Sequence, residues 1–229
     1  MELSYEEKCR LVEEMSKFIT PRRQQLFQQV INLRTRHITI VLENIFQPHN
    51  ASAVLRSCDL TGVQDVHIIE NSNTYTINPD VAMGAYKWLT INKYNATDNN
   101  TPETYDILRR QGYKIVATTP HLESSNLDEI AIDKKIALVF GTELTGLTPF
   151  AIENADAFMK IPMSGFTESY NISVSAALSL YTLTQRMRLS SVNWQLSEIE
   201  KTDILLQWLR NTINRSEVLE KELMNKINT

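Results

Sequence analysis

The chain has 229 residues, of which 42% are hydrophobic and 22% are charged, so it can bury a full hydrophobic core and is not disordered throughout. No apolar run approaches the roughly 20 residues that span a membrane, the first residues lack a signal-peptide pattern, and two cysteines are too few for a disulfide framework. We therefore expect one domain with appendages or at most two domains, no membrane partner, and a cytoplasmic location with reduced thiols.

The formal charge of −4 argues mildly against a nucleic-acid partner, but the positive charge is unevenly distributed. Residues 15–42 and 169–197 contain no Asp or Glu. A phosphate backbone responds to local charge, within a Debye length of about 10 Å. The arginines of these two runs are therefore candidate RNA contacts, although a solvated helix face explains each run about equally well: Arg22, Arg23, Arg34, Arg36, Arg186 and Arg188.

In chain order, helices alternate with strands. Ser4 and Glu7 have the spacing of a capping box that begins a first helix, and Thr20-Pro21 ends that helix and begins a second. The apolar patterns predict strands at 37–43, 66–70, 88–91, 113–118, 136–140 and 158–161. Helices or helical turns are predicted at 50–60, 81–86, 101–112, 148–154 and 171–188, with one or two more between 198 and 226.

This alternation predicts an α/β fold, with a mostly parallel sheet and helices on both of its faces. The helices at the two ends of the chain look like additions to a core of roughly 150 residues. We therefore expect a basic helical extension at residues 1–36, an α/β domain at 37–190, and a second helical extension at 191–229.

Several familiar chemistries are missing from the sequence. None of the six glycines forms a GxGxxG turn after the first strand, which weighs against a Rossmann dinucleotide site and a Rossmann-type methyltransferase. A phosphate-binding GxxxxGK[ST] loop is also absent. The four histidines are scattered without metal-ligand spacing, so no metal is expected.

Three polar stretches lie where a strand gives way to a loop or helix, at residues 47–56, 139–147 and 161–175. Open α/β sheets bind their ligands at such strand ends. In the first stretch, Asn50 is a predicted helix cap, and the long side chain of Arg56 can lean back along the helix toward it. An amide and a guanidinium at a helix N-terminus favour an anion, although a capping Asn and a surface Arg explain both residues as well.

The other two stretches carry a carboxylate and a hydroxyl–amide pair. Glu143 lies between Gly141 and Gly146, and glycines allow a backbone to approach a ligand closely. Ser169 and Asn171 precede a long apolar helix that either residue could cap. Each feature alone has an ordinary structural explanation, but three of them at strand exits in one core favour a ligand site.

Together the three stretches closely resemble the SpoU/TrmH family of RNA 2′-O-ribose methyltransferases, in the SPOUT superfamily. The matching motifs are Asn50-x-x-Ala53-x-x-Arg56, Gly141-x-Glu143-x-x-Gly146, and Ile161-Pro162-Met163 through Ser169-x-Asn171-x-Ser173-x-Ser175. The similarity covers about residues 21–188. Within it, residues 37–70 are most similar to the branch that methylates guanosine 18 of tRNA.

The resemblance implies a C-terminal trefoil knot, which the general rarity of knots would have argued against. It also implies that S-adenosylmethionine binds in the knot loops as methyl donor, mainly through backbone groups. Carried over by position, the cofactor-binding residues are Thr118, Gly141, Ile161, Met163 and Tyr170. Tyr170 departs from the family, which more usually has Leu there.

By the same resemblance, Arg56 is the catalytic residue, and four others shape the ribose and phosphate site: Asn50, Glu143, Ser169 and Asn171. Because the pKa of arginine exceeds 12, Arg56 is a poor general base. We expect it to act with a substrate phosphate, orienting the ribose hydroxyl and stabilising the developing alkoxide. Whether Arg56 itself accepts the proton is left open.

The resemblance further implies a homodimer, for which the apolar face of the long helix is the candidate surface: Ile172, Val174, Ala177, Leu178 and Tyr181. The same face could instead pack inside its own subunit. The implied partner is tRNA, and the basic terminal segments resemble those that grip it. Two alternatives are a methyltransferase of ribosomal RNA or another tRNA position, and a non-catalytic RNA-binding protein of the same fold. The short N-terminal extension favours tRNA.

Overall fold

The computed structural model describes residues 3–119 and 124–227, and the chain divides into two compact units. One unit is continuous and spans Thr35–Trp194. The other joins Met1–Arg34 with Gln195–Thr229, so the two terminal segments expected as separate extensions pack together.

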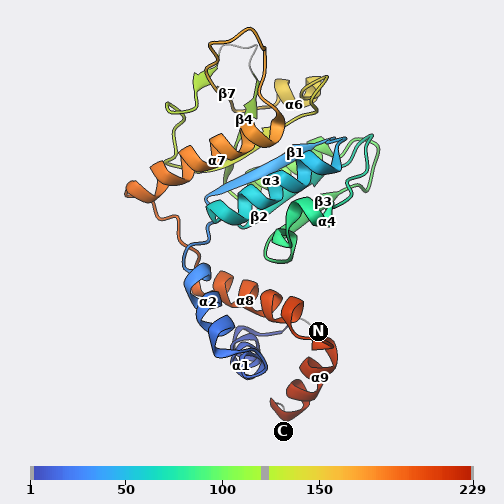
Figure 1. Cartoon of the computed structure of the whole chain (residues 1–229), viewed down its shortest axis with the longest axis vertical. Coiled ribbons are helices and arrows are strands. Elements are labelled where there is room, and N and C mark those ends of the chain that lie inside the picture. Colours follow the sequence, from blue (N-terminus) through green and yellow to red (C-terminus); the bar gives the residue numbers. More distant parts are fainter. Residues whose placement is uncertain (1–2, 120–123, 228–229) are drawn as a thin grey trace. The chain divides into compact units, whose positions relative to one another are not determined.

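The larger unit is built on a parallel sheet (Figure 1), which has seven strands within the described residues, in the order β3-β2-β1-β6-β4-β7-β5. The strands are β1 Ile38–Glu43, β2 Asp65–Ile69, β3 Thr90–Tyr94, β4 Tyr113–Thr118, β5 Ser125–Asn126, β6 Lys135–Phe140 and β7 Ala157–Lys160. The expected α/β fold with a parallel sheet is therefore confirmed. The predicted edge strand is displaced by two residues, since β3 begins at Thr90, and β5 was not predicted.

Helices cover both faces of this sheet. They are α3 Pro48–Thr61, α4 Pro79–Ala82, the 3₁₀ turn η1 Ala85–Lys87, α5 Thr101–Arg110, α6 Pro149–Glu153 and α7 Ile172–Leu189. In Figure 1, α3 and α7 lie next to each other on one side of the sheet. The predicted helix at 50–60 begins earlier, because Gln47 is its N-cap and Pro48 occupies the first turn.

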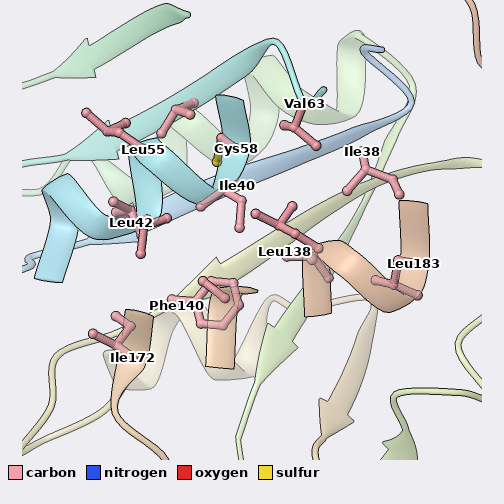
Figure 2. Close-up of a cluster of buried hydrophobic side chains, with 14 of the residues drawn as sticks. Ile38, Ile40, Leu42, Leu55, Cys58, Val63, Leu138, Phe140, Ile172 and Leu183 are labelled. Carbon is pink, nitrogen blue, oxygen red and sulfur yellow. The ribbon is translucent and has the colours of Figure 1, made fainter. Parts of the chain in front are cut away.

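The two-residue period of the strands divides their side chains between two hydrophobic layers. From β1, Ile40 and Leu42 pack toward α3 and α7, whereas Val41 packs toward α5 and α6. Figure 2 shows the first layer, in which Leu55 of α3 and Leu183 of α7 meet the strands. Since β1 and β6 are central and buried on both faces, they fix the strand ends from which the polar loops leave.

The smaller unit contains the helices α1 Tyr5–Ser16, α2 Pro21–Ile31, α8 Glu198–Thr212 and α9 Ser216–Ile227. The predicted capping box at Ser4 and Glu7 is present. The core of this unit includes Phe27 and Trp208, whose rings meet edge to face at a centroid distance of 5.3 Å. Among the described residues, no helix is long and apolar enough to cross a membrane.

Candidate active site

A cavity of about 660 Å³ opens at the carboxyl ends of β4, β6 and β7, within the size range of small-molecule sites. Its walls come from the ends of these strands, the start of α3, and the segment leading into α7. All three polar stretches identified in the sequence contribute residues to it. The chain therefore places its candidate site where parallel sheets bind ligands.

Hydrogen bonds join the three stretches at one side of the cavity. Asn50 is 4% exposed, and its Nδ2 donates to Oε1 of Glu143 at 2.6 Å and to Oε1 of Gln47 at 3.1 Å. The Oδ1 of Asn50 accepts from Nδ2 of Asn171 at 3.2 Å. Glu143 and Asn171 are exposed, so their remaining polar atoms can bind a ligand. We call Asn50, Glu143 and Asn171 the polar triad.

The tertiary contacts explain why Asn50 is not the helix cap that the sequence predicts. Pro48 already fixes the first turn of α3, and Gln47 occupies the cap position, although its side chain makes no capping bond to the helix backbone. The side chain of Asn50, inside the helix, is used to join distant parts of the chain. The polar triad thus holds the Glu143 carboxylate in one orientation before any ligand binds.

Glu143 is carried by a tightly closed loop after β6. Thr142 and Gly146 exchange backbone hydrogen bonds, at 2.9 Å from N of Thr142 and 3.1 Å from N of Gly146. The hydroxyl of Thr142 also lies 2.7 Å from that of Thr145. Gly146 has φ +69°, and a Cβ on Gly141 would collide with the backbone of Gly146. Both glycines of the predicted motif are therefore required by the backbone.

The start of α7 forms another wall of the cavity. Of the two candidate caps, Ser169 and Asn171, it is Asn171 that caps this helix, through a 2.8 Å bond from N of Ser173 to its Oδ1. Ser169 and Tyr170 precede it, and both line the cavity with exposed side chains. The residues expected to bind a cofactor all line the same cavity: Thr118, Gly141, Ile161, Met163 and Tyr170.

Arg56 is not among the described residues that line this cavity. It is exposed on α3, six residues after Asn50, which turns it about 120° around the helix from the polar triad. The structure therefore brings together Asn50, Glu143, Ser169 and Asn171 as expected, but directs Arg56 to a different face of α3.

The arginines of the two basic runs fall into two groups. Arg22 and Arg23 are exposed at the start of α2. The other four are buried or partly buried. Arg34 is 2% exposed, and its guanidinium carbon lies 5.4 Å from the ring centroid of Trp208, while Arg36 pairs with Asp65 at 3.0 Å.

The two arginines near the end of α7 are partly buried. Arg186 donates to the backbone oxygens of Leu127 and Ile130. Arg188 donates to the oxygen of Thr61 at 2.8 Å, and partial burial lowers the pKa of its guanidinium. These contacts brace the ends of α7 and α3.

One face of α7 remains open. Val174, Leu178 and Tyr181 are 44%, 40% and 64% exposed, whereas Ile172 is buried in the core of its own chain. The apolar face predicted from the sequence is thus shared between the core and solvent. Among the described residues, no group of three or more His, Cys, Asp or Glu is placed to bind a metal.

Sequence reasoning missed Gln47 and Leu144 as cavity residues. Gln47 is the first residue of the polar stretch 47–56, and its position directly before Pro48 was the signal that could have identified it as a cavity residue. Leu144 follows Glu143 and gave no signal, because an apolar residue in a turn has no pattern that distinguishes a site from a core contact.

Comparison with known proteins places these features in a family. The SpoU rRNA Methylase family matches residues 37–181. A tRNA (guanosine(18)-2′-O)-methyltransferase of Borreliella burgdorferi is 44% identical, covering 90% of this chain and 93% of that protein. One of Thermus thermophilus is 30% identical, covering 83% and 97%. The crystal structure of the A. aeolicus TrmH/SpoU tRNA modifying enzyme superimposes with a TM-score of 0.74 at 31% identity, covering 84% and 98%.

Proposed function

The chain belongs to the SpoU rRNA Methylase family, and we propose that it is a tRNA (guanosine(18)-2′-O)-methyltransferase. In this reaction a methyl group passes from S-adenosylmethionine to the ribose 2′-hydroxyl of a D-loop guanosine. The observation that carries the proposal is the polar triad, which joins three stretches distant in sequence at the edge of one cavity. Relatives matched over nearly their whole length bear this name, which favours tRNA over ribosomal RNA.

S-adenosylmethionine fits the chemistry of the cavity. When bound, it supplies a methyl group activated by a positively charged sulfur. Apolar residues such as Phe140, Leu147 and Ile161 line much of the cavity, and the missing Cβ of Gly141 lets the loop that forms one wall close tightly. We assign its binding to the residues carried over by the family resemblance: Thr118, Gly141, Ile161, Met163 and Tyr170. No metal is part of the proposal.

The polar triad positions the ribose. The carboxylate of Glu143 keeps free acceptor capacity beside its bond from Asn50, so it can accept a hydrogen bond from a ribose hydroxyl. Asn171 and Ser169 supply further polar atoms at the same edge. Holding the hydroxyl in line with the methyl group lowers the entropic part of the barrier.

Arg56 acts from outside the cavity in this proposal. Its exposed guanidinium is available to a phosphate of the target nucleotide. The positive charge of the guanidinium then stabilises the ribose oxygen, which becomes negative as the hydroxyl reacts. We expect Arg56→Ala to abolish turnover while the affinity for S-adenosylmethionine changes little.

The fold and assembly belong to the same proposal. We propose a catalytic domain at residues 37–190 whose C-terminal part forms a trefoil knot. In support, β7 lies inside the sheet between β4 and β5, although it follows both in sequence. We also propose a homodimer that covers the exposed stripe of Val174, Leu178 and Tyr181, and a cytoplasmic enzyme.

The helical extension at residues 1–36 is proposed to assist tRNA binding, whereas the extension at 191–229, which carries the acidic run 198–222, is proposed to have a packing role. Arg22 and Arg23 carry the tRNA-binding role best, because both are exposed and the acid-free run around them creates local positive charge. The buried Arg34 serves the packing of its own unit through Trp208.

The proposal is tested by methyl transfer from labelled S-adenosylmethionine to unmodified tRNA, with the modified nucleotide mapped. We expect 2′-O-methylguanosine in the D-loop, made by the wild type and lost in Arg56→Ala. Transfer to ribosomal RNA instead would move the substrate to the alternative that the family name suggests. A protein that binds RNA without binding S-adenosylmethionine would be a non-catalytic member of the fold.

A further inference from the structure

The loop after β6 holds one apolar side chain in solvent. Leu144 is 98% exposed, yet it lies at the tip of the loop closed by the paired backbones of Thr142 and Gly146. Because hydrogen bonds between backbone and hydroxyl groups hold this loop closed, Leu144 cannot fold back into the core as it could from a flexible loop.

The position of Leu144 connects it to the chemistry. It directly follows Glu143 of the polar triad, and both residues line the cavity. A side chain at the tip therefore projects at the edge where the ribose of the substrate must enter. An exposed leucine next to a hydrogen-bonded carboxylate contributes nothing to the cavity's polar chemistry, so its partner must be apolar.

The substrate supplies such a partner. Nucleotides of folded RNA are stacked, and we expect the target nucleotide to leave its stack when its ribose enters the cavity, as bases do in enzymes that extrude them. Proteins that open base steps insert apolar side chains, leucine among them, between the bases.

We propose that Leu144 is a positioning residue that inserts beside the target guanosine and fills the space the extruded base leaves. The inference rests on the proposed function. The loop after β6 then has two tasks: Glu143 holds the ribose, and Leu144 keeps the neighbouring bases apart. A rigid loop suits both, because the ribose and the displaced bases then have a fixed separation.

The test uses tRNA that carries 2-aminopurine at the nucleotide on the 3′ side of the target guanosine. Unstacking of this base raises its fluorescence. We expect the wild-type protein to raise the fluorescence on binding, and Leu144→Ala to lose most of that rise. The value of kcat/KM for methyl transfer should fall about 10- to 100-fold, while the dissociation constant for S-adenosylmethionine stays unchanged.

Two variants separate insertion from general damage. Leu144→Met keeps an apolar side chain of similar volume and should retain both the fluorescence rise and the turnover. Leu60→Ala removes another exposed leucine, 77% accessible, about 20 Å along α3 from Gln47 at the cavity, and should behave as the wild type.

Wild-type fluorescence and turnover in Leu144→Ala would overturn the inference, as would a wild type that leaves the probe stacked. A change in the oligomeric state of Leu144→Ala in solution would also overturn the inference. In that case, Leu144 would contact a second copy of the chain and not the RNA. Failure of the proposed function is distinguishable, because the wild type would bind tRNA and change the probe without transferring a methyl group.

Discussion

Gly141→Ala is the substitution whose effect the geometry of the site defines most sharply. An added Cβ would fall well within 3.0 Å of the carbonyl carbon and oxygen of Gly146 and of the backbone nitrogen of Leu147. All three are backbone atoms, so no flexible side chain can yield. To restore an ordinary 3.4 Å contact, the two segments must separate by about 1 Å.

That separation acts directly on the site. The bond from N of Thr142 to O of Gly146, now 2.9 Å, would lengthen to about 4 Å and be lost. Glu143 is carried between these segments, so its 2.6 Å bond to Asn50 would be strained or broken as well. A misplacement of about 1 Å costs on the order of 100-fold in rate, and overpacking costs about 1–3 kcal/mol of stability.

Steady-state methyl transfer and calorimetric binding of S-adenosylmethionine measure these effects, and urea unfolding measures the stability. Gly165→Ala is the matched control. Among the described residues, a Cβ there meets one atom within 4 Å, the backbone nitrogen of Thr167 at 4.0 Å, so turnover should stay within about threefold. A Gly141→Ala enzyme with wild-type kcat/KM and cofactor affinity would refute the account of the loop.

Other predictions concern the triad, pH and salt. Asn50→Ala removes the group that joins Glu143 to Asn171 and should lower kcat about 100-fold with little change in the dissociation constant for S-adenosylmethionine. A loss of cofactor affinity as large as the loss of kcat would instead place Asn50 in the cofactor site. Burial lowers the pKa of His67 from 6.5 to about 4. The free energy of unfolding should therefore be highest above pH 6.5, where His67 is neutral in both the folded and the unfolded chain, and should fall as the pH drops toward 4. Urea unfolding should show a loss of about 3 kcal/mol. His67→Gln should remove most of this dependence of the unfolding free energy on pH, and the control His49→Gln, at an exposed position, should leave it unchanged. Binding of tRNA should weaken steeply with salt, and replacing Arg22 and Arg23 by Ala should reduce the slope of log K against log salt by about one to two; an unchanged slope would exclude both arginines from the interface.

Local chemistry made much of the fold predictable. The capping box of Ser4 and the cap that Asn171 provides depend on neighbours within four residues, and both are found. The buried parallel strands were recognisable because both of their faces are covered, which produces continuous apolar runs. The two residues of β5 are too few to form any such pattern.

Contacts between distant residues were the part that the sequence could not supply. Asn50 has the chemistry of a cap, and nothing near it indicates that its amide binds Glu143 and Asn171. Similarly, Arg34 is an ordinary surface residue in its local sequence, but Trp208 covers its guanidinium. The motifs predicted which residues belong to the candidate site, while tertiary packing decided which of them face one another.

The most direct test of the central claim compares two tRNA substrates that differ by one atom. One carries guanosine at position 18, and the other carries 2′-deoxyguanosine there, which lacks the hydroxyl that receives the methyl group. We predict label transfer from S-adenosylmethionine to the first and none to the second, with both bound equally well. Equal transfer to both would show that the methyl group goes elsewhere, and would contradict the assignment of the cavity and polar triad to ribose methylation.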